Sequence, residues 1–432
     1  MAATTNLADT GTAAPPSRRE RLRRATVSAL TPIAVRLSSP SVWRYLWLVP
    51  PKPRFLRRHI APHRGSWGTF DREIPERLRT FPGIRRDEAA ADAAFAEEPL
   101  QDWIAVHDDT VRWMYRHGWD VYLVSAPRMV RSGRAITRVR RRPSAPVKRT
   151  TDPEELARLI KARGAELGIS AVGIAAYDPR YTLAQAAGNV IGDRVIVCAM
   201  EQNWAATQTS PSVRSERSSF AAFGEVLRLG SQLGEYIQDL GYRVRPHDAQ
   251  GEDIVLQYAV AAGLGQMGAN GQVLTPFAGS RCRITTIETD APLAIDHPVD
   301  YGINEICEAC GICARRCPAG AIPGRRRMHR GVEKYKLNMA RCAPVVAQAH
   351  GCAVCMKVCP VQRYGLKAVI DELEATGEIL GKGTEELEGY TFHDRHYGPG
   401  ERPTLRRDWL RPEGLTFDPE RKRPLGDSLR HF

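Results

Sequence analysis

Hydrophobic and polar positions follow the periods of helices and strands in turn over residues 151–298. Leu156, Leu159 and Ile160 share one face of a helix that begins at Asp152, whose side chain can cap the first turn. Strands are expected at 171–174, 194–200 and 283–288, and helices at 220–240 and 254–262. Because helices and strands alternate, the pattern predicts an α/β domain over 151–298.

The first 150 residues are patterned less clearly. An alanine-rich stretch at 89–96 predicts a helix, and the run Val121–Val124 predicts a short strand. Basic residues crowd positions 131–150, which we interpret as a linker. We therefore expect a basic, partly ordered N-terminal region at 1–150. Beyond 375 the pattern is uninformative and is treated as a C-terminal extension, 376–432.

The composition shows that the excess positive charge is concentrated in the first 150 residues. The chain has 432 residues and a formal net charge of +13, and residues 1–150 hold 28 Lys and Arg against 14 Asp and Glu. The rest of the chain is close to neutral, which argues against a uniformly basic nucleic-acid binder. The densest cluster is Arg138, Arg140, Arg141 and Arg142. A solvated linker is our interpretation, with contact to RNA or to an acidic partner as the alternative.

Targeting signals in the sequence are incomplete. No run approaches eighteen apolar residues, so we expect no transmembrane helix. Ser17–Arg23 contains the arginine pair of a twin-arginine export signal, and a mildly apolar stretch follows at 25–35. No aromatic follows the arginine pair and no small-residue cleavage site closes the segment, which favours a cytoplasmic protein. Export through this signal, or membrane-surface contact through Trp43, Tyr45 and Trp47, stays open.

Eight of the ten cysteines fall between 307 and 359 in two runs. The runs are Cys307-x2-Cys310-x2-Cys313-x3-Cys317-Pro318 and Cys342-x9-Cys352-x2-Cys355-x3-Cys359-Pro360. In two-cluster ferredoxins the cysteine before the proline ligates the other cluster. The spacing thus predicts one [4Fe–4S] cluster on Cys307, Cys310, Cys313 and Cys359, and a second on Cys317, Cys342, Cys352 and Cys355. Structural zinc does not explain two Cys-Pro endings in crossed order.

A glycine motif earlier in the chain invites a different interpretation. Gly263-Leu-Gly265-Gln-Met-Gly268 matches the G-x-G-x-x-G pattern of dinucleotide-binding proteins. That fingerprint follows a strand and opens a helix, whereas here a helix is expected before it and Pro276 follows closely. We therefore expect no nicotinamide cofactor at this loop.

The same glycines belong to a segment that resembles the corrinoid-binding stretch of reductive dehalogenases. It reads Ala261-Ala262-Gly263-Leu-Gly265-Gln-Met-Gly268-Ala-Asn270-Gly271-Gln-Val-Leu-Thr275-Pro276-Phe-Ala-Gly279-Ser-Arg281-Cys-Arg283. Thr289-Asp290-Ala-Pro292-Leu293 and Gly351-Cys352-Ala-Val-Cys355-Met356-Lys-Val-Cys359-Pro360 continue the likeness. Epoxyqueuosine reductase, a tRNA-modifying relative, shares the order of parts. The resemblance covers roughly 150–375.

The resemblance implies a fold and a pair of cofactors. It implies a nitroreductase-like α/β domain (151–298) that holds cobalamin, followed by a bacterial ferredoxin-like domain with two [4Fe–4S] clusters (299–375). Small, side-chain-free positions would let the flat corrin lie close to the backbone. The residues implied to contact the corrinoid are Gly263, Gly265, Gly268, Asn270, Gly271, Thr275 and Gly279.

The resemblance also implies an activity. Electrons from a reduced ferredoxin, a flavodoxin or a reductase would pass through the clusters to cobalt, for reductive cleavage of a small organic substrate, halogenated in the family. The family's proton-donating tyrosine falls on Phe223, which has no proton to give, and its assisting arginine falls on Arg281. Asp248 is our candidate for the missing acid. The alternatives are a tRNA-modifying enzyme of the epoxyqueuosine reductase type and an iron–sulfur electron-transfer protein without corrinoid.

Overall fold

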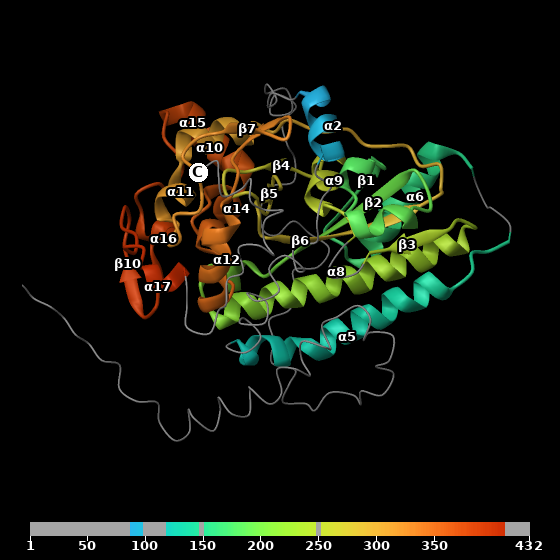
Figure 1. The fold of residues 1–432 in the computed structure, drawn as a ribbon, viewed down its shortest axis with the longest axis horizontal. Coiled ribbons are helices and arrows are strands. Elements are labelled where there is room, and N and C mark those ends of the chain that lie inside the picture. The colour runs from blue at the N-terminus through green and yellow to red at the C-terminus, as the bar shows by residue number, and fades with distance from the viewer. Residues whose placement is uncertain (1–86, 98–117, 147–150, 248–251, 411–432) are drawn as a thin grey trace, which may run out of the picture.

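The computed structural model describes residues 87–97, 118–146, 151–247 and 252–410 (Figure 1). An antiparallel sheet lies at the centre of the first half, in the order β1-β2-β6-β3. Its strands are β1 (Ala171–Ala176), β2 (Arg194–Glu201), β6 (Cys282–Thr289) and β3 (Val244–Pro246). The strands expected at 171–174, 194–200 and 283–288 are confirmed.

Strand β2 is buried on both faces, which explains its unbroken apolar sequence. Ile196, Cys198 and Met200 join one hydrophobic core, whereas Val195 and Val197 point into another. The first core is completed by α6 (Pro153–Leu167) and α8 (Val213–Asp239), and the second by α9 (Val255–Ala261). The sheet is thus covered by helices on both sides.

The two long helices of this domain, α6 and α8, begin at residues with a capping side chain. Asp152 accepts a hydrogen bond from the Glu155 amide, and Pro153 occupies the first turn of α6, as predicted. Ser212 caps α8 in the same way, through the Ser215 amide. Helix α8 thus begins seven residues before the predicted start at Phe220. The prediction placed the start too late because the first two turns are polar and show no apolar periodicity.

The structure corrects the prediction for residues 121–150. Val121–Val124 are not a strand but lie in α5 (Trp119–Arg141), which packs along α8 (Figure 1). Residues 131–141, expected to be a linker, form the second half of that helix. The buried positions Val121, Ile136 and Val139 follow a helical period, and the arginines of the last turn suit the negative end of the helix dipole. The helix expected at 89–96 is present as α2 (Glu88–Glu97).

The cysteine-rich part has its own hydrophobic core. Its elements are α10 (Ile303–Cys310), α11 (Ile312–Arg316), β7 (Arg327–His329), β8 (Val332–Lys334), α12 (Met339–Gln348), α13 (Val354–Lys357), α14 (Pro360–Tyr364) and α15 (Leu366–Thr376). Residues beyond 375, including Leu387, Tyr390 and Phe392, pack into the same core. They belong to α16 (Glu385–Glu388), β9 (Tyr390–Phe392), β10 (Arg395–Tyr397) and α17 (Arg407–Leu410).

Short elements lie between the longer helices and strands of the α/β domain. They are η3 (Pro179–Tyr181), η4 (Ala184–Asn189), α7 (Trp204–Thr207), β4 (Gln266–Met267) and β5 (Val273–Leu274). The Gly263–Gly268 motif follows α9, contains β4 and is followed by β5, so it lacks the strand before and the helix after that a dinucleotide fingerprint requires.

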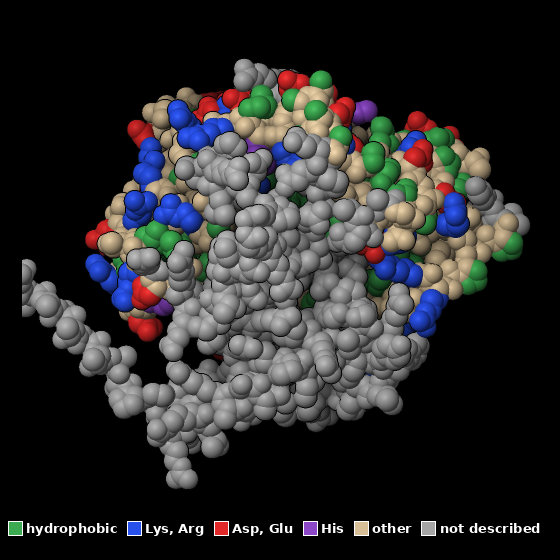
Figure 2. All heavy atoms as spheres, in the orientation of Figure 1, with side chains coloured by type: hydrophobic (Ala, Val, Ile, Leu, Met, Phe, Trp, Pro, Cys, Tyr) green, Lys and Arg blue, Asp and Glu red, His purple; other side chains and the backbone are tan. Residues whose placement is uncertain are grey.

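The described surface carries charges of both signs. Figure 2 shows Lys and Arg side chains on the described surface of the cysteine-bearing end, with Asp and Glu side chains among them. No helix among the described residues is long and apolar enough to cross a membrane.

Candidate functional site

The cysteines of the two sequence runs line two cavities in the cysteine-rich part. The first cavity is lined by five cysteines: Cys307, Cys310, Cys313, Cys355 and Cys359. Three of these residues lie on α10 and α11, and Cys359 is the residue that precedes α14. The structure thus brings the last cysteine of the second run to the first three cysteines of the first run.

The second cavity has a volume of ≈ 110 Å³ and contains the complementary set, Cys317, Cys342, Cys352 and Cys355. Cys355 and Asn270 line both cavities, so the two are neighbours. Gly311, with φ at +58°, turns the chain between α10 and α11, so that the first three cysteines of the first run line one cavity.

The surroundings of the sulfur atoms suit metal thiolates. All ten cysteines are free of disulfides. The Ala269 amide donates to Cys307 Sγ and the Ala321 amide to Cys317 Sγ, both at 3.4 Å. Burial raises the pKa of the Cys352 thiol to about 12, so thiolates here need a bound cation to form. The donor set, its grouping and the N–H···S bonds all fit two iron–sulfur clusters.

Polar side chains complete the wall of the second cavity on the side of the α/β domain. Glu216 and Ser219 come from the first two turns of α8, and Arg283 comes from β6. Arg283 Nε donates to Ser219 Oγ at 3.0 Å. Burial raises the pKa of the Glu216 carboxyl to about 7, although Arg283 counteracts it. Sequence reasoning missed Glu216 because the beginning of α8 was placed after it.

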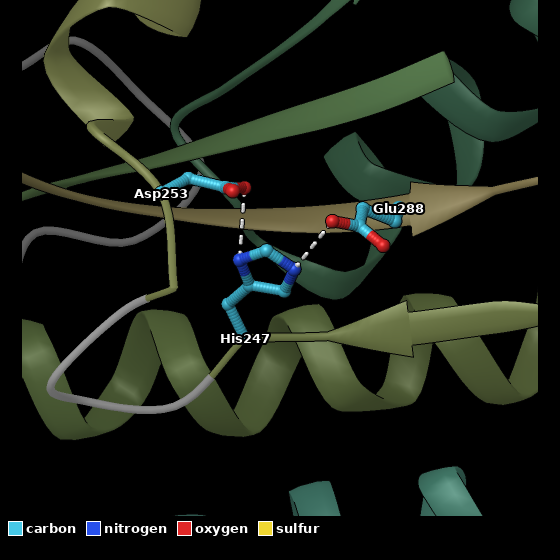
Figure 3. Close-up of side chains that lie close together, drawn as sticks. All are labelled: His247, Asp253 and Glu288. Carbon is cyan, nitrogen blue, oxygen red and sulfur yellow. Dashed lines mark ion pairs between the residues drawn. The ribbon is translucent and has the colours of Figure 1, made fainter. Parts of the chain in front are cut away.

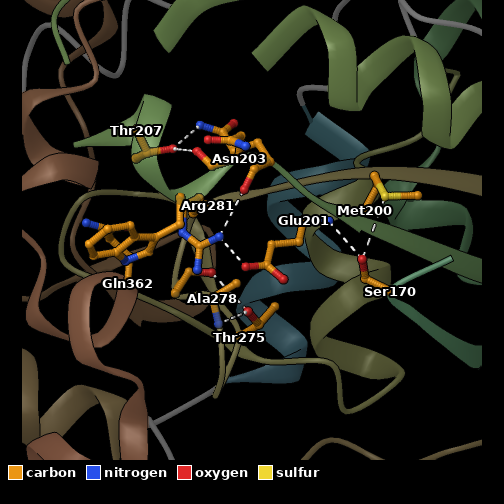
Figure 4. Close-up of polar contacts among 12 residues, drawn as sticks. Ser170, Met200, Glu201, Asn203, Thr207, Thr275, Ala278, Arg281 and Gln362 are labelled. Carbon is orange, nitrogen blue, oxygen red and sulfur yellow. Dashed lines mark hydrogen bonds and ion pairs between the residues drawn. The ribbon is translucent and has the colours of Figure 1, made fainter. Parts of the chain in front are cut away.

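Arg281 lies in a different environment from the one the resemblance implied. It is fully buried, and its guanidinium pairs with Glu201 and donates to the Gln202 carbonyl at 2.9 Å (Figure 4). It lines neither cysteine cavity. Asp248 lies outside the described residues. Phe223 is partly buried and packs against the core of the α/β domain.

The glycines that the resemblance implies at a corrin pack closely against the protein's own atoms. A Cβ atom at Gly263 would lie 2.6 Å from the His297 carbonyl oxygen, at Gly265 2.3 Å from the Leu274 carbonyl oxygen, and at Gly279 2.6 Å from the Gln362 amide nitrogen. Similar contacts hold Gly268 against the Leu274 side chain and Gly271 against Leu337. Close packing of the chain on itself is thus a sufficient reason for all five.

The two polar residues of that segment are also used internally. Thr275 is fully buried, and its hydroxyl donates to the Gly279 carbonyl at 3.1 Å within a turn (Figure 4). Asn270 donates from Nδ2 to Ser280 Oγ, but its side chain also borders both cysteine cavities. Of the seven implied corrinoid residues, Asn270 alone borders both described cysteine cavities.

Comparison with known proteins identifies relatives in sequence. No family model matches the chain. It is 28% identical over 213 residues to the tetrachloroethene reductive dehalogenase of Sulfurospirillum multivorans, covering 46% of this chain and 42% of that protein. The enzyme of the same name from Dehalobacter restrictus is 33% identical over 180 residues, 38% of this chain and 32% of that protein. The epoxyqueuosine reductase of Salmonella typhimurium is 29% identical over 154 residues, 32% and 36% of the two chains.

Solved structures extend the likeness to the fold. The catabolic reductive dehalogenase NpRdhA matches with a TM-score of 0.59 and 20% identity, covering 78% of this chain and 53% of that one. A second reductive dehalogenase structure, described as suggesting a mechanism for B12-dependent dehalogenation, gives the same TM-score at 21% identity, over 76% and 52%. This chain spans less than half the length of the two curated dehalogenases and about half that of the solved ones. The chain therefore resembles the reductive dehalogenases in both sequence and mixed α/β fold, and epoxyqueuosine reductase in sequence.

Proposed function

We propose that this chain is an iron–sulfur oxidoreductase of the reductive dehalogenase type. The observation that carries the proposal is the grouping of the eight cysteines: two adjacent cavities receive them in the crossed sets that a two-cluster ferredoxin requires. The curated relatives of the chain are reductases, which supports an oxidoreductase. Within it we propose an α/β domain at 151–298 and a cluster domain that begins at 299.

Residues of the second cavity could supply the charge stabilisation and the proton that the proposed reaction needs. When bound on the eight cysteines, two [4Fe–4S] clusters would supply one-electron transfer at low potential. Beside the second set, the Arg283 guanidinium offers positive charge where negative charge would develop on a substrate. Glu216 can hold a proton on its carboxyl near neutral pH, because its pKa is about 7. Reductive cleavage needs both functions.

A corrinoid is the part of the proposal that rests on resemblance alone. B12-dependent dehalogenation is ascribed to one of the solved relatives. In this chain the five implied glycines and Thr275 are occupied by internal packing. That packing favours a second candidate function, an iron–sulfur electron-transfer protein without corrinoid. Added cobalamin decides between the two: a base-off absorption spectrum of the reconstituted protein supports the first, and iron without corrinoid binding supports the second.

Turnover tests the proposed activity. Anaerobically reconstituted protein would be assayed for oxidation of a reduced viologen dye with a panel of small halogenated compounds, with and without cobalamin. We expect halide release that depends on the clusters and is lost in Cys355→Ser, because Cys355 borders both cavities. Gln232→Ala, a change at an exposed position of α8, serves as the control. Full cluster content without halide release from any compound would contradict dehalogenation, and salt-sensitive binding of tRNA would favour the epoxyqueuosine reductase alternative.

A further inference from the structure

A second group of ligand-type side chains lies away from the cysteines, in the α/β domain. His247 follows β3, Asp253 precedes α9, and Glu288 lies on β6. Figure 3 shows the two carboxylates on either side of the imidazole ring, each directed toward a ring nitrogen. Asp253 Oδ2 lies 2.9 Å from Nδ1, and Glu288 Oε1 lies 3.3 Å from Nε2. The sequence analysis singled out none of these side chains as a metal ligand.

Burying these charged side chains costs free energy unless their net charge is compensated. The side chains of His247, Asp253 and Glu288 are each at most 2% exposed. Neither contact of the ring nitrogens has the geometry of a hydrogen bond, and Asp253 Oδ1 and Glu288 Oε2 have no hydrogen-bond partner within the described ranges. Two buried carboxylates beside one imidazole carry a net negative charge even when the ring is protonated.

Nearby cations are engaged elsewhere. Arg245, opposite Glu288 in the β3–β6 pair, forms its ion pair with Glu252 instead. Arg140 also approaches Glu252, at 3.6 Å. Besides its contact with His247, Asp253 Oδ2 accepts a long hydrogen bond of 3.4 Å from Thr286 Oγ1, which brings no positive charge. A divalent cation with a neutral imidazole would balance both carboxylate charges.

The spacing of the donor atoms suits such an ion. One donor atom from each of the three residues can be chosen so that all lie within 4.8 Å of one another. Donors that share one transition-metal ion at about 2.0–2.2 Å lie roughly 3–3.5 Å apart, so the side chains must move closer together when the ion binds. Because the two carboxylates face different ring nitrogens, the imidazole ring or one carboxylate must also turn. One nitrogen and two carboxylate oxygens are a ligand set that zinc and neighbouring divalent metals accept, with a position left for water.

We propose that His247, Asp253 and Glu288 form a binding site for a divalent transition-metal ion, separate from the iron–sulfur cysteines. The ion would join the end of β3, the start of α9 and strand β6. The competing state is an imidazolium held between the carboxylates: burial lowers the pKa of His247, but Asp253 and Glu288 outweigh this and raise it to about 9.

Zinc is a suitable probe because it is spectroscopically distinct from cluster iron. The full-length protein would first be loaded with its clusters, because empty cysteine sites would bind zinc themselves. Excess zinc is then removed, and iron and zinc are counted per chain. X-ray absorption at the zinc edge reports the neighbouring atoms. We expect about one zinc per chain beside about eight irons, with nitrogen and oxygen neighbours and no sulfur.

Variants locate the ion. His247→Gln and Glu288→Gln should each weaken zinc binding at least tenfold, because each removes one of only three protein donors. Glu252→Gln is the matched control, since this neighbouring carboxylate pairs with arginines, and it should retain zinc. Iron-loaded wild-type protein without zinc, or zinc with sulfur neighbours, would overturn the proposal. The wild-type spectrum decides even if a variant fails to fold.

Discussion

Gly279 can distinguish between two explanations of the glycine motif, close packing of the chain and contact with a corrin. Its backbone has φ at +53°, and a Cβ atom would lie 2.6 Å from the backbone nitrogen of Gln362. We expect Gly279→Ala to destabilise the protein by about 1–3 kcal/mol, because backbone must move. Urea unfolding measures the loss, with Gly188→Ala as control, since a Cβ there meets nothing within 4 Å. Equal stability of both variants, with corrinoid binding lost in Gly279→Ala, would instead favour the corrin-facing role.

Glu216 should make stability depend on pH. Its folded-state pKa of about 7 lies above the ordinary value of 4.5, because burial disfavours the charged form. The folded state therefore binds more protons between these values, and stability falls as pH rises through them. Glu216→Gln removes this loss of stability. Above a pH of about 7 the variant should therefore be more stable than the wild-type protein by roughly 2 kcal/mol, a figure reduced to allow for the partial exposure of the Glu216 side chain.

The measurement for Glu216 is the melting temperature as a function of pH. The two proteins should coincide near pH 4, where the carboxyl is protonated in the folded chain and largely protonated in the unfolded chain. Their curves should diverge toward pH 8. Parallel curves over the whole range would show that Glu216 titrates normally and holds no proton at neutral pH.

Among the contacts between the elements α5 and α8 is one buried side-chain amide. Gln238 on α8 donates from Nε2 to the carbonyls of Val139 and Arg142, at 2.9 and 2.8 Å, at the end of α5. Carbonyls at the end of a helix lack partners within that helix. We expect Gln238→Ala to cost about 1–3 kcal/mol in unfolding free energy and to loosen α5, as measured by amide hydrogen exchange. Gln232→Ala on the exposed face should leave exchange of α5 unchanged; identical exchange in both variants would contradict this coupling.

The same helices show what the sequence could and could not predict. The start of α6 at Asp152 was predictable, because capping is local chemistry. Strand β2 was predictable from its apolar run. Val121–Val124 was wrongly predicted as a strand, because four residues do not distinguish the two periods and the partner α8 is distant in sequence. Residues 131–141 were mistaken for a linker because exposed arginines hid the buried stripe of α5.

The candidate site also has a part that the sequence could predict and a part that it could not. The grouping expected for the cysteines followed from their spacing. Each expected set lines one of the two cavities, and Cys355 lines both. Arg283 and Glu216 could not be assigned to the second cavity, because their meeting depends on how β6 and α8 approach the cysteine-rich part. The group His247, Asp253 and Glu288 is likewise assembled from three separate elements. Ligands within one loop can be predicted from sequence, whereas contacts between elements need the fold.

At the scale of the whole molecule, the crossed sets mean that each sequence run serves both cavities. Cys359→Ala, in the second run, should therefore remove the same cluster as Cys307→Ala in the first. Electron paramagnetic resonance of the reduced variants checks this, because the remaining cluster should give one common spectrum. A Cys359→Ala spectrum that matches Cys352→Ala instead would show that each run holds its own cluster.

Two neighbouring [4Fe–4S] clusters are the feature on which the proposed function depends. The most direct test counts iron and acid-labile sulfide in the anaerobically reconstituted wild-type protein and records its reduced paramagnetic resonance spectrum. We expect about eight irons and about eight sulfides per chain, with a spectrum broadened by magnetic coupling between two adjacent centres. About four irons with a single uncoupled signal, or zinc in place of iron and sulfide, would contradict the two-cluster assignment.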